Sequence, residues 1–143
     1  MILEGWIPVT ALRDSSRSER KPPRLAVLLV DDEPLIRWSL RQALSDRGHS
    51  VVTAGSGAEA LAALETSDRD FDVVILDYRL PDRQDLGLLD DVRRRSPGSA
   101  VFMMTAFDED GMRVGAHDRG VRAVVDKPFQ VKAFVSMIEQ AFA

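Results

Sequence analysis

Short hydrophobic runs along the chain alternate with longer stretches in which hydrophobic residues recur every three or four positions. The runs are rich in aliphatic and β-branched side chains, which is typical of strands buried in a parallel sheet. They cover residues 25–30, 50–54, 73–76, 99–105 and 121–126. The longer stretches have the spacing of amphipathic helices. They extend from Pro34 to near Gly48, onward from Ser56-Gly57, and over 86–95, 109–118 and 130–142.

This alternation of five strands with five helices predicts an α/β fold. Because strand–helix–strand crossovers are right-handed, we expect a doubly wound five-stranded parallel sheet with helices on both faces. The helix at 109–118 is weaker than the others. Gly111 and Gly115 interrupt it, and each costs about 1 kcal/mol relative to alanine. We expect it to be the least rigid element.

Residues 1–24 differ from the rest of the chain. A mildly hydrophobic start is followed by a polar, basic stretch that closes with Pro22-Pro23. Such a segment cannot bury enough apolar surface to order itself. The sequence therefore predicts a flexible N-terminal extension, 1–24, and a single domain over 25–143. Because the chain ends one helix after the last strand, we expect no output domain in it.

Composition narrows the classes of function. The 143 residues carry a net charge of −4 and no cysteine. The negative charge argues against a general nucleic-acid or anionic-membrane surface, and the lack of cysteine excludes thiolate chemistry. No apolar run reaches the roughly 18 residues that a membrane span needs. Glu4 makes the N-terminus a poor signal peptide. We expect a cytoplasmic protein without direct DNA binding or membrane contact.

Polar side chains stand where the predicted strands end. Asp31-Asp32 follows the first strand, Asp77 the third and Lys127 the fifth, while Thr105 ends the fourth. The carboxyl ends of parallel strands share one edge of the sheet, where open α/β sheets bind ligands. A single aspartate after a strand is most simply explained as a turn residue. The combination of all these groups at one edge indicates a site.

These residues suit metal-assisted phosphoryl transfer. Clustered carboxylates repel one another unless a cation lies among them or their pKa values rise. Oxygen ligands with open positions suit Mg²⁺, which keeps several waters and shares phosphate oxygens. A carboxylate such as Asp77 can act as a nucleophile and form an acyl phosphate. The transfer needs charge neutralisation and a donor to the phosphoryl oxygens, roles that the acidic pair, Lys127 and Thr105 can fill.

The motifs LLVDDEP, VVILDYRLPD, MMTAF and DKPF stand in an order and spacing that resemble the receiver domains of two-component response regulators. The resemblance covers about residues 25–143. With IRWSL, DYRLPD and MTAF, the chain looks most similar to receivers of the nitrogen-regulatory, enhancer-activating type. The resemblance implies a flavodoxin-like (βα)5 receiver fold and a phosphorelay protein that catalyses only its own phosphorylation and dephosphorylation.

The resemblance also implies the phosphorylation partners and the metal ligands. Asp77 would accept a phosphoryl group from a histidine of a sensor kinase or of a histidine phosphotransfer protein. Mg²⁺ would be bound directly by Asp32, through water by Asp31, by Asp77 itself and by the backbone carbonyl of Arg79.

The remaining implied roles concern the response to phosphorylation. Thr105 would hydrogen-bond the phosphoryl group and Lys127 would pair with it, next to a cis Lys127–Pro128 peptide bond. Thr105 would then move inward and shift the face made by the fourth helix, fifth strand and fifth helix. The signal would pass to a downstream protein that the sequence does not name, and a phosphorylation-dependent homodimer is left open.

The chain departs from the family pattern at some positions. Val124 stands where the family usually has Tyr or Phe, so the aromatic half of the switch is missing. Asp85 replaces a frequent glycine, and we expect it to cap the helix at 86–95. Arg79 and Phe107 flank the path of the hydrolytic water in the family. Their bulk predicts slow self-dephosphorylation.

Other functions fit less well. A receiver-like interaction module that is never phosphorylated is the main alternative, chiefly because of Val124. A phosphohydrolase of the haloacid-dehalogenase type needs an aspartate two residues after its nucleophile, whereas Glu33 follows Asp31 and Arg79 follows Asp77. A flavodoxin needs a phosphate loop rich in Ser, Thr and Gly after the first strand, where this chain has an acidic one.

Four further features have a structural and a functional interpretation. Trp38 is offset from the hydrophobic stripe of the first helix, so both edge-of-core packing and contact with a histidine-bearing partner are open. His49 and His117 lack metal-ligand spacing, and we expect both at the surface. The basic run Arg93-Arg94-Arg95 is interpreted as a solvated face at a helix C-terminus rather than a nucleic-acid contact.

Overall fold

The computed structural model describes residues 23–106 and 111–143. The strands in this part are β2 (Ala26–Val30), β3 (Ser50–Ala54), β4 (Val73–Asp77), β5 (Ala100–Thr105) and β6 (Ala123–Asp126). The helices are α2 (Pro34–Asp46), α3 (Gly57–Thr66), α4 (Gly87–Arg95), α5 (Met112–Asp118) and α6 (Val131–Gln140). The alternation confirms the predicted α/β fold, with element ends displaced by a few residues.

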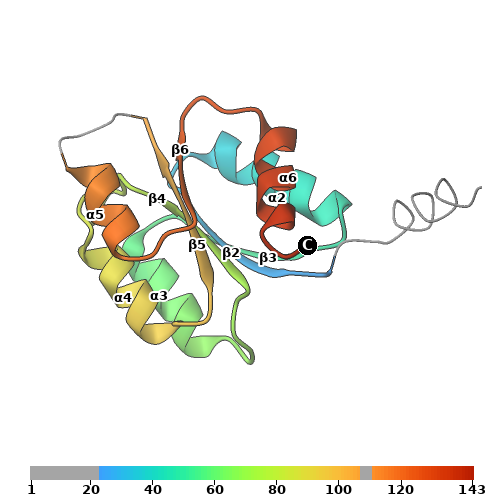
Figure 1. The fold of residues 1–143 in the computed structure, drawn as a ribbon. Helices are drawn as coiled ribbons and strands as arrows, with labels where there is room; N and C mark the ends of the chain where they lie inside the picture. Colours follow the sequence, from blue (N-terminus) through green and yellow to red (C-terminus); the bar gives the residue numbers. More distant parts are fainter. Residues whose placement is uncertain (1–22, 107–110) are drawn as a thin grey trace, which may run out of the picture.

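All five strands form one parallel sheet in the order β3-β2-β4-β5-β6. Figure 1 shows α2 and α6 on one side of this sheet and α3, α4 and α5 on the other. Asp77 pairs in register with Met104, and Thr105 pairs with Asp126. The carboxyl ends of β4, β5 and β6 therefore finish within one residue of each other.

Each face of the sheet has its own hydrophobic core. Alternate residues of the neighbouring strands β2 and β4 point toward α2 and α6, namely Val27, Leu29, Val73 and Ile75. The residues between them point toward α3, α4 and α5, namely Leu28, Val30, Val74 and Leu76. Because helices cover both faces, β2 and β4 are buried along their whole length, and Asp77 at the end of β4 is their only charged residue. The edge strands β3 and β6 are more exposed.

The helix starts follow local sequence signals. Pro34 occupies the first turn of α2, where its missing N–H leaves no hydrogen bond unmade. Ser56 is the N-cap of α3, and its side chain accepts a hydrogen bond of 3.1 Å from the Glu59 N–H. Both starts confirm the sequence-based prediction.

The start of α5 corrects the expectation that two glycines interrupt this helix. The helix begins only at Met112, and Gly111 is its N-cap with a left-handed φ of 77°. Glycine adopts this conformation without a steric penalty, so Gly111 suits the turn into the helix. Gly115 alone lies within α5, where an added Cβ would come within 2.6 Å of Leu86 Cδ1.

His49 corrects a second expectation, because it is buried rather than at the surface. It lies at the amino edge of the sheet, where the Leu25 N–H donates to its Nδ1 over 3.1 Å. Its Nε2 is 2.7 Å from Glu139 Oε2, and Arg47 Nη2 is 2.6 Å from Glu139 Oε1. The turn from α2 into β3 thus carries His49 beneath α6, which the spacing of the histidines could not reveal. His117 is exposed, as expected.

The basic run at the end of α4 is engaged within the domain. Arg93 donates to the Ser99 carbonyl over 3.2 Å. Arg94 pairs with Asp91, and Arg95 pairs with Glu65. These contacts support the interpretation as a solvated, internally paired face. Within 23–106 and 111–143, no helix is long and apolar enough to cross a membrane.

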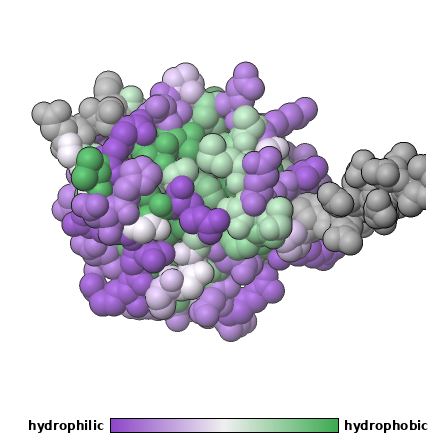
Figure 2. All heavy atoms as spheres, in the orientation of Figure 1, coloured by the Kyte–Doolittle hydropathy of each residue, from purple (hydrophilic) through white to green (hydrophobic). Residues whose placement is uncertain are grey.

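The face drawn in Figure 2 is mainly hydrophilic, with hydrophobic residues gathered where Figure 1 places α6. Exposed large hydrophobic side chains occur on α2 and α6, among them Leu35, Trp38 and Met137. Trp38 is 64% exposed, so it is not an ordinary edge-of-core residue.

Candidate functional site

The carboxyl edge of the sheet brings together the residues that the sequence singled out. Asp31 follows β2, Asp77 ends β4, Thr105 ends β5, and Lys127 follows β6. The first three are buried. The Lys127 N–H donates to the Thr105 carbonyl over 2.7 Å, which fixes the start of the Lys127 segment against β5.

Lys127 lies among three carboxylates. Its Nζ donates to Glu33 Oε1 over 2.8 Å and to Asp77 Oδ2 over 3.0 Å. Asp31 Oδ2 lies 2.9 Å from the same nitrogen. The Lys127 side chain is only 10% exposed, and those of Asp31 and Asp77 are almost fully buried, so these two contacts are shielded from water and from salt. One ammonium therefore balances part of a local excess of negative charge.

Asp31 is held by a hydrogen bond through one carboxylate oxygen and by an ion pair through the other. Its Oδ1 accepts a 2.8 Å hydrogen bond from the Glu33 N–H, and its backbone carbonyl accepts one from Arg37 Nη1 over 2.8 Å. Among the described residues, the buried Oδ2 has no hydrogen bond of acceptable geometry, although Lys127 is at ion-pair distance. A buried carboxylate oxygen without a partner is costly, so the Lys127 ammonium, 2.9 Å away, is the group that offsets the charge of this oxygen.

The electrostatics of the site follow from this crowding. Burial, and next the charge of Asp31, raise the pKa of Asp77 to about 6, although Lys127 and the Arg79 N–H oppose the rise. Burial alone would lower the pKa of Lys127, but contacts with Glu33, Asp31 and Asp77 outweigh it and raise that pKa above its ordinary value. Lys127 is therefore a fixed positive charge. The raised pKa of Asp77 means that its ionised form is destabilised in the folded protein.

The donor set fits a small divalent cation. Carboxylate oxygens of Asp31, Glu33 and Asp77 lie within 4.8 Å of one another. They form an oxygen-rich cluster of the kind that Mg²⁺ prefers. Asp32 is exposed and, with Arg79, lines the adjoining pocket of about 280 Å³. Of the predicted metal ligands, Asp32, Asp77 and Arg79 thus line one pocket, and Asp31 is buried beneath it. Glu33 lines the same pocket.

Glu33 is the residue that sequence reasoning missed. It follows Asp31-Asp32 directly, so the run of three acids was visible. Its contact with Lys127, 94 positions away, depends on the fold and on the turn into α2. No sequence pattern indicates which of the three acids reaches the lysine.

Other expected features have mixed outcomes. The Lys127–Pro128 bond is cis, as the resemblance implied. Val124 is partly buried against the core on the α3–α5 side. Asp85 does not occupy the N-cap of α4, which is Leu86, but its Oδ1 accepts a 2.9 Å hydrogen bond from the Gly87 N–H. Phe107, the expected partner of Arg79 in obstructing water, lies outside the described residues.

The loop after Asp77 is anchored to a neighbouring helix. Asp82 accepts hydrogen bonds from the N–H groups of Gly57 and Ala58, over 2.8 and 2.9 Å, at the start of α3. The Gly57 hydrogen bond is the main reason that the pKa of Asp82 is lowered. This contact holds the loop that carries Arg79 in place.

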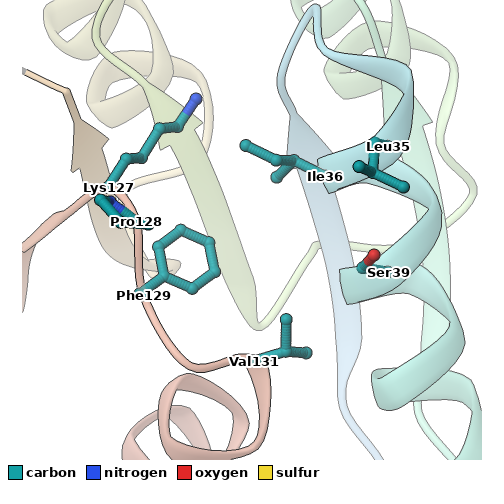
Figure 3. A pocket seen from close by; sticks show the side chains of 7 residues that line it. All are labelled: Leu35, Ile36, Ser39, Lys127, Pro128, Phe129 and Val131. Atoms are coloured by element: carbon teal, nitrogen blue, oxygen red, sulfur yellow. The ribbon is translucent and has the colours of Figure 1, made fainter.

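A smaller apolar pocket of about 170 Å³ adjoins the site. It lies between the start of α2 and the segment that leads into α6 (Figure 3). Ile36 extends from α2 toward the segment with Lys127 and Phe129. Leu35 at its rim is 73% exposed. An apolar, open surface therefore lies next to the acidic pocket.

Comparison with known proteins identifies the family. Residues 27–139 match the family described as response regulator receiver domain. The chain belongs to this family. The receiver domain is 35% identical over 117 residues to NtrC of Escherichia coli K12, and 36% identical over 119 residues to the probable transcriptional regulatory protein TcrX of Mycobacterium tuberculosis. The match to NtrC confirms the expected likeness to receivers of the nitrogen-regulatory type.

The matches differ in how much of each relative they cover. They span 82% and 83% of this chain but only 24% of NtrC and 49% of TcrX. The receiver domain therefore corresponds to about a quarter to a half of those proteins.

Solved structures support the same fold. A CheY-like receiver domain protein from Methanospirillum hungatei has a TM-score of 0.77 at 27% identity, covering 84% of this chain and 94% of that one. NtrX from Brucella abortus has a TM-score of 0.74 at 33% identity, covering 84% of this chain and 27% of that one. The flavodoxin-like (βα)5 receiver fold is thereby confirmed.

Proposed function

We propose that this receiver domain accepts a phosphoryl group on Asp77 and signals through changed protein contacts. The observation that carries the proposal is the position of Asp77 at the end of β4, with its Oδ2 3.0 Å from Lys127 and its pKa raised to about 6. Strongly perturbed carboxylates in a pocket are candidates for chemistry rather than for stability. The donor would be a phosphohistidine of a sensor kinase or phosphotransfer protein, in the cytoplasm.

The chemistry is a displacement at phosphorus. An Asp77 carboxylate oxygen forms a bond to phosphorus while the bond from phosphorus to the donor imidazole breaks, and the imidazole nitrogen keeps the electron pair. Mg²⁺, when bound, supplies neutralisation of the phosphoryl charge. In this proposal Asp31, Asp32, Asp77 and the Arg79 carbonyl hold the metal.

The side chains on either side of Asp77 complete the proposed reaction. Lys127 already lies within hydrogen-bonding reach of Asp77 and would pair with the phosphoryl oxygens. Thr105 ends the neighbouring strand, one residue beyond the register partner of Asp77. It would donate its hydroxyl to the phosphoryl group. The domain would thus promote only its own phosphorylation and dephosphorylation.

The response would travel to the face formed by α5, β6 and α6. Thr105 pairs in register with Asp126 of β6, so displacement at Thr105 is felt directly by that strand. Arg113 of α5 also pairs with Asp126. Val124 fills part of the core on this side, which leaves the response without the usual aromatic side chain. A downstream protein or a second copy of the chain would recognise the changed face.

Val124 also supports the second candidate, a receiver-like module that binds partners without being phosphorylated. This alternative keeps the fold and the exposed α2 surface but does not use Asp77. It gives no account of the raised pKa of Asp77 or of the three carboxylates around Lys127.

The two candidates are separated by intact mass after incubation with acetyl phosphate and Mg²⁺. We expect one added phosphoryl group on the wild type and none without Mg²⁺. Asp77→Ala should remain unlabelled, while Asp68→Ala, at an exposed aspartate in the loop after α3, should be labelled like the wild type. Absence of an adduct on the wild type, with a control receiver labelled, would favour the unphosphorylated module.

A further inference from the structure

Glu33 stands at the N-cap of α2 but does not cap it. Its side chain makes no capping hydrogen bond to α2, whereas Ser56 does so for α3. Glutamate is also not among the side chains that favour this position. The backbone of Glu33 is fixed instead by Asp31, whose Oδ1 accepts its N–H. The Glu33 carboxylate therefore makes no capping hydrogen bond to α2 and can contact other groups.

That carboxylate is used to bind Lys127 from the solvent side. The Glu33 side chain is 56% exposed, while those of Asp31 and Asp77 are almost fully buried. Of the three distances from Lys127 Nζ, the one to Glu33 is the shortest, at 2.8 Å. Lys127 is thus held between two inner carboxylates and one outer carboxylate.

We propose that Glu33 is a positioning residue that tethers Lys127 in the unphosphorylated domain and releases it when Asp77 is phosphorylated. This inference rests on the proposed function. A phosphoryl group on Asp77 adds strong acceptor oxygens and negative charge beside Lys127. Glu33 is the outermost partner and the one with access to water. Its contact with Lys127 is therefore the one that costs least to break, because water can hydrate the released carboxylate.

Glu33 also affects which donors reach Asp77. Its negative charge lies at the rim of the pocket that contains Asp77 and Arg79. A small anionic donor such as acetyl phosphate has to approach past this charge, and Lys127 is partly neutralised by it. Glu33→Gln keeps the length of the side chain but removes the charge. We expect transfer from acetyl phosphate to become about threefold to tenfold faster in this variant.

The first experiment compares initial rates of labelling by intact mass at fixed Mg²⁺. The matched control is Glu65→Gln, which makes the same change of charge at the end of α3, where Glu65 pairs with Arg95. The control should stay within about twofold of the wild type, because its distance from the pocket allows salt to screen it. The acceleration in Glu33→Gln should shrink as salt is added.

The second experiment observes the tether itself and does not depend on phosphorylation. The chain has three lysines, Lys21, Lys127 and Lys132, so their ammonium groups can be resolved by ¹⁵N NMR. We expect a less mobile ammonium for Lys127 than for Lys132, and a gain of mobility at Lys127 in Glu33→Gln. Assignment follows from Lys132→Arg.

The outcomes separate this inference from the proposed function. Unchanged Lys127 mobility in Glu33→Gln would overturn the tether. Slower labelling together with about tenfold weaker Mg²⁺ binding by calorimetry would overturn it too, because Glu33 would then be a metal ligand. If the wild type takes no phosphoryl group but the mobility of Lys127 still rises in Glu33→Gln, the proposed function fails, and the release step fails with it, while the tether stands.

Discussion

The two edges of the sheet hold buried charged groups in opposite ways. At the amino edge both ring nitrogens of His49 have partners, and both oxygens of Glu139 are bonded by His49 or Arg47. At the carboxyl edge three carboxylates share Lys127. Asp31 Oδ2 there has no hydrogen bond of acceptable geometry within the described part of the chain.

This difference distinguishes a structural cluster from a functional one. A satisfied polar network stabilises and specifies the fold. A crowded cluster costs stability until a ligand neutralises it, and such costs are tolerated where chemistry takes place. Substitutions at the amino edge should therefore lower the free energy of unfolding of the protein. Removal of a carboxylate charge at the carboxyl edge should raise it.

The largest effect is expected at the amino edge. His49→Ala removes a buried ring, leaves the Leu25 N–H without its acceptor, and leaves Glu139 Oε2 with Arg47 as its remaining partner. We expect a loss of about 3 kcal/mol in the free energy of unfolding, measured by urea denaturation. The exposed His117→Ala is the control and should stay within about 0.5 kcal/mol of the wild type. A loss at His49 no larger than at His117 would contradict a structural role for this cluster.

A smaller effect of opposite sign is expected at the carboxyl edge. The pKa of Asp77 in the fold is about 6, above its ordinary 3.8. The folded state therefore holds a proton that the unfolded state releases, and the contribution of Asp77 to stability falls as pH rises through that window. In the absence of Mg²⁺, Asp77→Asn should be more stable than the wild type by about 1 to 3 kcal/mol near neutral pH.

The pH dependence checks the cause of that gain. The difference between Asp77→Asn and the wild type should disappear when pH falls below the ordinary pKa of an aspartate, because Asp77 is then protonated in both states. Asp68→Asn, at an exposed aspartate outside the pocket, should show no comparable difference at either pH. If Asp77→Asn were equally more stable than the wild type in acid, the charge of Asp77 would not be the cause of its higher stability.

The smallest effect concerns the anchor of the loop after Asp77. Asp82→Ala removes the acceptor for the N–H groups of Gly57 and Ala58. We expect a loss of about 1 kcal/mol by urea denaturation, as for a helix cap. The pKa of Asp82 is lowered in the fold, so this loss should diminish in acid, once the carboxylate is protonated. A loss that persists unchanged in acid would indicate packing rather than capping.

The sequence was sufficient for the fold and for the approximate place of the site. Unbroken runs such as 73–76 indicate strands covered on both sides, and parallel strands force Asp31, Asp77 and Lys127 to one edge. Side-chain direction was not accessible in the same way. The contact between Glu33 and Lys127 depends on one turn into α2 and one loop after β6. Burial of His49 depends on how α6 crosses the turn into β3.

Gly111 shows a further reason for error. A glycine near a weak helix is compatible with an interruption or with a left-handed N-cap, and only the backbone φ of 77° distinguishes the two. Asp82 is similar, since its partners at the start of α3 are 24 and 25 positions away. Contacts over such separations arise from the packing of whole elements, which local patterns do not contain.

We expect the carboxyl edge to be a destabilised acidic site that Mg²⁺ relieves through Asp77. The most direct measurement is the free energy of unfolding of the wild type and of Asp77→Asn, each with Mg²⁺ and with a chelator. Asp77→Asn should be the more stable protein in chelator, and Mg²⁺ should stabilise the wild type more than the variant, so that the difference in free energy of unfolding narrows. A wild type that is the more stable protein in chelator and does not respond to Mg²⁺ would contradict this expectation.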